Sequence, residues 1–511
     1  MLCLLSASTA QNVGTYQAEQ SPNLTTYKCT LAGGCTPSAT AVVLDANWRC
    51  EQQCIRNSSA ILTPHSAPRW THTTEVGKYD NCYDNEKGWD PTLCPNASAC
   101  YANCAIEGVS AADYADNYGV HAANASLTLD FTHGPNASAA SLASARTYLL
   151  AEDRASYELL KLKNREISFD VDVSTLPCGV NGALYLVTMD ADGGMARHPQ
   201  NKAGAALGTG YCDAQCPQDV HFVDGLPNSA GWAGGKGGAG SCCAEMDLWE
   251  ANMHTTALTP HPCAATATAA TKCDGATNCS GVCDSAGCDV QPFRNGAPDF
   301  YGPGDLFDLD TSRPFTVTTA FVTADGTDAG PLASIRRHYT QDGRVLATPP
   351  VTFPNATASF PDLTDGYCAA EAAAFDVVNA SFARLGGLGG IDAALTQGMA
   401  LVFSVWDDNA THMLWLDGEE FPLNSTKPGV HRGPCPVASG DPADVEHRYA
   451  PRSVYASFSD VRVGEIGSTD LPVAPPAPAP TMETPMAATP TAAAGSTWTR
   501  WLSLVLGRAV A

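Results

Sequence analysis

Alternating apolar and polar residues predict β-strands along most of the chain. The segments REISFDVDVS and PFTVTTAFVT place an apolar residue at nearly every second position, which is typical of half-buried strands. IRRHYTQDGRVL predicts a hairpin that turns at Asp342-Gly343. SVYASFSDVRVGEIGS indicates either a strand pair or one long strand.

Helical periodicity is scarce. Only Ala369–Phe375 and Ile391–Ala400 are candidate helices, both short, and glycine and proline interrupt most other segments. We therefore expect an all-β fold, an antiparallel β-sandwich with long loops stapled by disulfides.

Composition narrows the function classes. The chain has 511 residues, of which 44% are hydrophobic and 16% charged, so it can bury a large core. Its formal charge of -25 argues against nucleic acid or an anionic membrane as partner. No run of about 18 apolar residues occurs, so no membrane span is predicted. The negative charge of the chain is more compatible with a neutral or cationic ligand.

Several features indicate a secreted glycoprotein. Residues 1–10 resemble the end of a secretory signal, and ten Asn-x-Ser/Thr sequons follow. Of 21 cysteines, Cys3 would leave with the signal, and Cys50 and Cys54 fall in an unusual segment discussed below. The remaining 18 suffice for nine disulfides, and their spacing does not suit zinc.

The composition changes after Asp470. Residues 471–511 begin as a Pro/Ala/Thr-rich linker and end in a short apolar tail without cysteine. We expect no further folded module there. A removed lipid-anchor signal is the alternative, although Arg508 interrupts the apolar tail.

Three acids crowd into the segment SCCAEMDLWEAN. On a regular strand, Glu245 and Asp247 share one face, whereas Glu250 lies on the other face with Met246 and Leu248. Burying a charged group beside apolar residues is costly. A β-bulge before Glu250 would return it to the face of Glu245 and Asp247, so we predict a bulge if the three acids act together.

Such a set suits glycoside cleavage with retention of configuration. That reaction needs an ionised nucleophile and a protonated acid about 5–5.5 Å apart. Glu245 and Glu250 would be this pair, with Asp247 between them helping to keep a proton on Glu250. The alternative is an exposed acidic strand that binds nothing or a calcium ion.

The surrounding motifs favour catalysis. GSCCAEMDLWEAN and ALTPHPC closely resemble glycoside hydrolase family seven, the fungal cellulases, as do VVLDANWR, WTHTT, LPCGVNGALYLVTMDADGG, GTGYCDAQCP, FYGPG, VWDD, MLWLD and GEIGST. The resemblance covers residues 11–470 in the family's order. It implies one catalytic domain, a curved concanavalin-like jelly roll whose loops roof a cellulose-binding cleft or tunnel.

The resemblance also implies roles for individual residues. Glu245 matches the nucleophile, Asp247 its helper, Glu250 the acid/base, and His261 a histidine near the acid/base. The residues that match sugar contacts are Trp48, Trp70, Arg146, Tyr185, Tyr211, Asp213, Gln215, Trp406, Trp415 and Arg432. The family further suggests Cys212 and Cys216 as the disulfide partners of Cys242 and Cys243.

Two departures from the family stand out. Residues 50–69 interrupt a segment that the family keeps contiguous, which we interpret as a retained intron, with a genuine loop clipped by Cys50 and Cys54 as the alternative. In addition, KCDGATNCSGVCDSAGC is shorter than the roofing loop of exo-acting members, and Asn409-Ala410 stand where those members often have aromatics. Other loops have full length, so we expect a partly open tunnel.

Taken together, the sequence predicts a secreted, monomeric cellobiohydrolase that acts on β-1,4-glucan chains of cellulose, from the reducing end, and needs no cofactor or metal. An endoglucanase on the same fold is the nearest alternative. A carbohydrate-binding protein without catalysis is a remote one.

Overall fold

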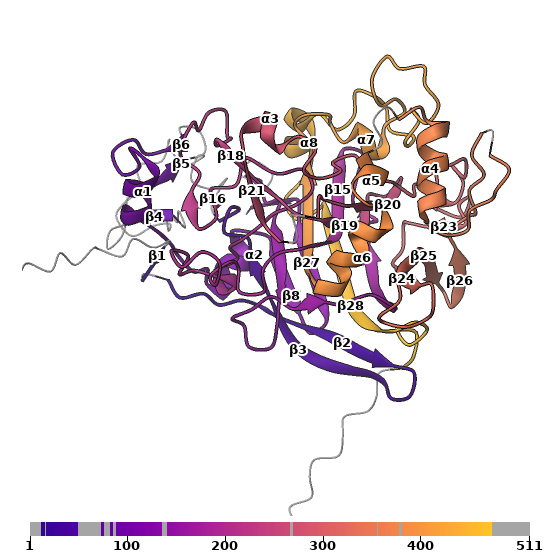
Figure 1. Cartoon of the computed structure of the whole chain (residues 1–511), viewed down its shortest axis with the longest axis horizontal. Helices are drawn as coiled ribbons and strands as arrows, with labels where there is room; N and C mark the ends of the chain where they lie inside the picture. Colours follow the sequence, from indigo (N-terminus) through magenta and orange to yellow (C-terminus); the bar gives the residue numbers. More distant parts are fainter. Residues whose placement is uncertain are drawn as a thin grey trace, which may run out of the picture. The chain divides into compact units, whose positions relative to one another are not determined.

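The predicted strands assemble into one long sheet. Within the described residues, this sheet contains 15 strands, and its main path runs from β20 to β26 (Figure 1). Neighbouring strands are antiparallel, except that β2 and β28 pair in parallel.

The computed structural model describes residues 12–15, 17–49, 73–75, 82–84, 88–134, 141–265, 269–354, 356–377 and 381–472. The predicted leader (1–10), the predicted insert (50–69), Trp70, and all but the first two residues of the 471–511 tail lie outside these residues. The catalytic-domain boundaries at 11 and 470 stay a prediction.

The strands of the large sheet are, along its path, β20 (Thr256–His261), β19 (Glu245–Ala251), β15 (Val180–Val187), β27 (Met399–Asp407), β12 (Arg146–Leu150), β3 (Gly34–Leu44), β2 (Asn23–Thr30), β28 (Tyr455–Glu465), β14 (Arg165–Asp172), β24 (Phe315–Thr323), β25 (Leu332–Gln341) and β26 (Arg344–Ala347). Off this path, β27 also pairs with β13 (Leu159–Leu160), and β28 with β9 (Ser126–Asp130), which pairs with β8 (Val120–Ala123).

Short strands and helices lie in the connections. The short strands are β1 (Asn12–Val13), β4 (Thr73–Glu75), β5 (Tyr83–Asp84), β6 (Gly88–Trp89), β7 (Cys104–Ile106), β10 (Thr132–His133), β11 (Ser141–Leu142), β16 (Phe222–Val223), β17 (Leu226–Pro227), β18 (Ala239–Cys242), β21 (Thr271–Asp274), β22 (Tyr301–Gly302) and β23 (Leu309–Asp310). The helices are α1 (Ala97–Asn103), α2 (Ala111–Asp116), η2 (Ala205–Leu207), α3 (Gly275–Cys279), α4 (Asp365–Ala374), α5 (Ser381–Arg384), α6 (Leu388–Gln397), α7 (Leu414–Asp417) and α8 (Pro442–Arg448). No helix among the described residues is long and apolar enough to cross a membrane.

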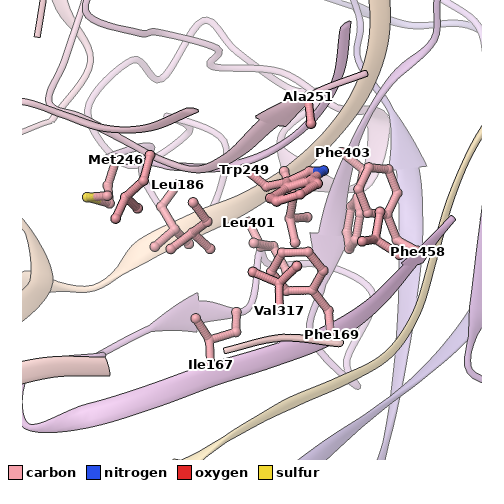
Figure 2. Close-up of a cluster of buried hydrophobic side chains, with 14 of the residues drawn as sticks. Ile167, Phe169, Leu186, Met246, Trp249, Ala251, Val317, Leu401, Phe403 and Phe458 are labelled. Carbon is pink, nitrogen blue, oxygen red and sulfur yellow. The ribbon is translucent and has the colours of Figure 1, made fainter. Parts of the chain in front are cut away.

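The sheet curves back on itself and forms two layers. Strands β19, β15 and β27 of one layer pack on β14, β24, β25 and β28 of the other, as aromatic contacts between the layers show. Trp249 lies 6.4 Å from Phe169 between ring centroids, and Phe403 lies 5.7 Å from Phe458. Figure 2 shows this interlayer core, with Met246, Trp249 and Ala251 from β19. The predicted all-β sandwich is confirmed.

The layer that contains β19, β15 and β27 is also covered on its second face. A separate apolar cluster on that face includes Val43, Tyr148, Ala183 and Val402. Every residue of β15 and of β19 is therefore buried. Polar side chains on these strands leave water when the chain folds, which explains why period-two alternation is weak in this part of the sequence.

The local predictions were largely confirmed. β14 and β24 coincide with the alternating segments, and β25 and β26 form the hairpin whose turn residues Asp342 and Gly343 both have positive φ. The C-terminal segment is one long strand, β28. Both predicted helices exist, but with other bounds: α4 spans Asp365–Ala374, and α6 ends at Gln397, with Ala400 already in β27, because Gly398 (φ 103°) ends the helix. The short helices α1, α2, α5, α7 and α8 were not predicted.

Nine disulfides link the described cysteines. Adjacent Cys242 and Cys243 point to opposite faces of the chain and pair separately, with Cys216 and Cys212 respectively, which confirms the predicted partners. The longest link in sequence joins Cys178 before β15 to Cys435, 257 residues later. The nine pairs account for the 18 cysteines that remained after Cys3, Cys50 and Cys54 were set aside.

Candidate active site

The predicted β-bulge lies in β19. The pairing of β19 with β20 shifts between Asp247 and Glu250, and its pairing with β15 shifts so that Asp247 faces Tyr185 while Trp249 faces Leu184. Leu248 is thus the extra residue, opposite no residue of either neighbour. Leu248 and Trp249 both enter the interlayer core. Glu250 consequently returns to the face that carries Glu245 and Asp247, as predicted.

All three acids line one cavity of about 940 Å³. Glu245 is 7% exposed, Asp247 4% and Glu250 8%, so all three are nearly buried. This burial excludes the alternative of an acidic strand on the surface. The three carboxylates are also not among the side-chain groups close enough to share a metal ion, which counts against the calcium alternative.

Each acid has its own hydrogen-bond partner. The backbone N–H of Ala214 donates to Oε2 of Glu245 over 3.0 Å, and Nδ2 of Asn181 donates to Oε1 of Glu250 over 3.0 Å. Nε2 of His261 lies 2.8 Å from Oδ2 of Asp247. These donors favour the ionised carboxylates and partly offset the cost of burial.

His261 links Asp247 to the next loop. Its Nδ1 lies 2.7 Å from the carbonyl oxygen of Asp284, which can only accept, so Nδ1 carries a proton. The contact between Nε2 and Asp247 then needs one further proton, held by either group. Gly287 leaves room for this ring, since a Cβ there would come within 2.6 Å of Cε1 of His261.

Simultaneous ionisation of the three acids is unfavourable. Burial raises the pKa of Glu250 well above its ordinary value, and the charge of Asp247 raises this pKa further. Burial likewise raises the pKa values of Asp247 and Glu245, and Asp213 adds to both effects. A set of carboxyls that resists full ionisation is suited to general acid catalysis.

The predicted sugar contacts form two groups around the acids. In the first, the hydroxyls of Tyr185 and Tyr211 lie 2.8 Å apart, and that of Tyr211 donates to Asp213 over 2.7 Å. The Arg146 guanidinium stacks 3.5 Å from the ring centroid of Tyr211 and bonds to Asp45. All four predicted residues of this group line the cavity.

The second group lines other parts of the same cavity. Trp406 and Trp415 are stacked with centroids 6.2 Å apart, and Gln215 donates to the carbonyl of Ser285 over 2.8 Å. Arg432 also lines the cavity. Trp48 is not among the lining residues; its ring packs 5.4 Å from the Arg146 guanidinium. Trp70 lies outside the described residues.

Sequence reasoning missed several polar residues that line the cavity or contact its acids. Asn181 was hidden inside an apolar strand, and nothing in its spacing points to Glu250. Arg294 lies between Asp289 and Glu371, donates to Glu371 over 2.7 Å, and shares Asp289 with Arg432. We call Asp289, Arg294, Glu371 and Arg432 the arginine cluster. Asp289 and Arg294 are five residues apart, but Glu371 and Arg432 lie far along the chain, so only the fold brings the four together.

Three groups of side chains among the described residues lie close enough together to hold a metal. All three consist of disulfide sulfurs, and one also includes His254. Disulfide sulfurs are not thiolates, the form of cysteine that binds metals.

The comparisons with known proteins agree with this geometry. The model of glycosyl hydrolase family 7 matches residues 13–60 and 50–470. A family 7 cellobiohydrolase from Daphnia pulex is 41% identical (TM-score 0.80), and the match covers 90% of this chain and all of that one. A Melanocarpus albomyces cellobiohydrolase, solved with cellotetraose, is 36% identical (TM-score 0.76; 89% and 99% covered). The Humicola insolens endocellulase EGI is 33% identical (TM-score 0.71; 90% and 100% covered). The chain therefore belongs to glycosyl hydrolase family 7.

Proposed function

We propose that this protein is a cellobiohydrolase that cleaves β-1,4-glucosidic bonds of cellulose with retention of configuration. The observation that supports this proposal most strongly is the bulge in β19, which directs three buried carboxyls into one cavity lined by tyrosine and tryptophan side chains. Aromatic faces suit the apolar faces of glucosyl rings. Similar proteins include both cellobiohydrolases and an endocellulase.

The contacts support a division of labour between the acids. Glu245 accepts a main-chain N–H, which cannot turn away, and this favours the ionised form that a nucleophile needs. Glu250 is held by a side-chain amide instead. Burial and the charge of Asp247 favour the protonated form of both glutamates, so the difference in donor distinguishes them. Glu250 would protonate the leaving oxygen and then activate water, while Asp247 and His261 orient the pair.

Loops that border the cavity favour exo action over endo action. Residues of α4 and α5, among them Glu371 and Phe382, line it from the full-length loop predicted to roof the tunnel. Gln215 and Ser285 join two further loops beside the acids. The shortened segment between Cys273 and Cys288 leaves the roof partly open, so we expect modest processivity and some internal cutting, with attack from reducing ends.

Product analysis tests this proposal. Protein made with and without residues 50–69 would be incubated with amorphous cellulose, and the soluble sugars separated by chromatography. Cellobiose as the main early product supports the cellobiohydrolase, whereas a spread of longer oligosaccharides supports the endoglucanase. NMR should show the β-anomer first, because retention conserves the configuration; an initial α-anomer would contradict the mechanism.

The Glu245→Gln variant serves as the blank. It should bind cello-oligosaccharides but release no sugar. Equal sugar release by wild type and variant would point to a contaminating enzyme, and binding without any release by folded wild type would favour the non-catalytic alternative.

We also propose that the protein is secreted. Nine disulfides in the described part of the chain require an oxidising compartment to form. Expression in a secreting host, followed by N-terminal sequencing of the protein in the medium, should find cleavage near residue 10. Retention inside the cell with residues 1–10 attached would argue against it.

A further inference from the structure

Arg337 is a buried cation that the proposed chemistry does not use. It lies on β25, in the layer opposite β19, and is 5% exposed, with its side chain pointing into the interlayer core. Within the described residues, no carboxylate lies within ion-pair distance of it. Burial accordingly lowers the pKa of Arg337 below its ordinary value, partly offset by Tyr339. An unpaired buried charge is costly, so its contacts need an explanation.

Those contacts lead to the catalytic strand. Nη2 of Arg337 donates to the carbonyl oxygen of Leu248, the extra residue of the bulge. The same nitrogen donates to Oγ1 of Thr319 over 3.1 Å, and Nε donates to that hydroxyl over 3.3 Å. Thr319 is the residue opposite Arg337 on β24, so the guanidinium is held from its own layer while it reaches the other.

The position of Leu248 makes this contact important. Because Leu248 faces no residue on β15 or β20, the ladder does not fix its peptide as it fixes those of Asp247 and Glu250. A buried carbonyl without a donor is unfavourable. The alternative to the bulge is regular pairing, which would turn Glu250 into the core beside Met246, part of the cluster seen in Figure 2.

We propose that Arg337 is a positioning residue for Glu250: its guanidinium holds the Leu248 carbonyl from the opposite layer, stabilises the bulge, and thereby keeps Glu250 facing the cavity. This inference rests on the proposed function, because it takes Glu250 as the acid/base. Trp249 assists, since its ring centroid lies 5.8 Å from the guanidinium carbon.

Arg337→Met tests the proposal, because methionine fills much of the same space without donating. With a soluble aryl cellobioside, kcat should fall by about tenfold or more, as for a misplaced general acid, while KM changes by less than about threefold. The alkaline limb of the pH profile should move to lower pH, because Glu250 leaves the buried place beside Asp247 that raises its pKa. Arg337→Lys keeps a cationic donor and should restore part of the loss.

Ile335→Ala is the matched control. It lies two residues away on the same strand, is 1% exposed, and loses core packing without touching β19 through any hydrogen bond. It should lower Tm but leave kcat and the pH profile close to wild type. The proposal would be overturned if Arg337→Met and Ile335→Ala changed kcat and the pH profile equally at equal loss of Tm. It would also be overturned if folded Arg337→Met kept the kcat and pH profile of the wild type.

Thr319→Val covers the case in which Arg337→Met fails to fold. It retains the guanidinium but removes the hydroxyl that orients it, and should shift kcat and the alkaline limb in the same directions by a smaller amount. Wild-type behaviour of this variant and of Arg337→Lys would overturn the proposal. If the wild-type enzyme itself releases no sugar, the proposed function fails instead, so the two failures are distinguishable.

Discussion

Two groups of buried carboxyls line the same cavity but differ in their counter-charges. On β19, Glu245, Asp247 and Glu250 have raised pKa values because burial disfavours their charged forms, and repulsion by Asp247 (on both glutamates) and Asp213 (on Glu245 and Asp247) adds to this. In the arginine cluster, burial again opposes ionisation, but the guanidinium groups of Arg294 and Arg432 lower the pKa of Asp289 to about 2.

The difference lies in the counter-charge rather than in burial. Asp289 has two arginines within ion-pair distance, and Glu371, which shares Arg294 with it, still has a raised pKa through burial and the charge of Asp289. The β19 acids have amide, imidazole and main-chain donors instead of arginines. Two arginines thus keep Asp289 in its charged form, whereas the one arginine beside Glu371 does not offset burial and the β19 acids have none. Only a carboxyl that favours its protonated form can transfer a proton.

Glu250→Gln should give the largest effect, because it removes the transferable proton. On cellulose, activity should fall by about 10²–10⁴-fold. The loss should be much smaller with dinitrophenyl cellobioside, since that leaving group departs without protonation. Glu245→Gln is the comparison variant and should lose activity on both substrates. If Glu250→Gln is equally impaired on both, Glu250 is not the acid.

Asp247→Asn tests whether the charge of Asp247 raises the pKa of Glu250 by repulsion. Without the charge of Asp247, the pKa of Glu250 falls, so the proton is lost earlier and the alkaline limb of kcat/KM moves to lower pH. We expect a decrease in kcat of roughly 10- to 100-fold, because His261 and Glu245 also lose their shared neighbour. A pH profile identical to wild type would show that Asp247 does not set the protonation of Glu250.

Asn181→Ala should act in the opposite direction on the same group. Its amide favours the ionised form of Glu250, so its removal raises the pKa of Glu250 and moves the alkaline limb to higher pH. The decrease in kcat should be about fivefold, the value of one hydrogen bond. Asn228→Ala, at another buried asparagine bonded to main-chain groups, should change stability without moving the limb.

Asp289→Asn should affect stability more than chemistry. The pKa of Asp289 falls from an ordinary 3.8 to about 2 on folding, which corresponds to about 2 kcal/mol of stabilisation. A depressed pKa stabilises the fold above the unfolded value and ceases to do so as the pH falls through the folded value. Calorimetry should therefore find a lower Tm for the variant at pH 6 and a difference that narrows between pH 4 and 2.

Asp328→Asn provides the exposed control for that experiment. Its carboxylate pairs with Arg165 at the surface, where the side chain is 62% exposed, so Tm should change little. The comparison of buried groups would be wrong if both variants lost the same stability, or if Asp289→Asn matched the β19 variants in loss of kcat.

The sequence by itself determined several strands, the number of disulfides and the location of the acids. Alternation placed β14 and β24, the Asp342-Gly343 turn placed the hairpin of β25 and β26, and the family motifs placed Glu245, Asp247, Glu250 and His261. Even the bulge could be foreseen, because strict alternation would have buried Glu250 beside Met246. These features are local, and neighbouring residues carry the signal.

Only the tertiary structure decided what surrounds the acids. Asn181, Arg294 and Arg337 come from separate strands and loops, and each contacts its carboxyl or carbonyl partner across 69 to 89 positions of sequence. Side-chain spacing along one strand cannot reveal such partners, since Asn181 meets Glu250 through the pairing of β15 with β19, and Arg337 meets Leu248 only when the two layers pack and exclude water. That exclusion of water makes each distant donor strong enough to set the pKa values and the direction of the groups it touches.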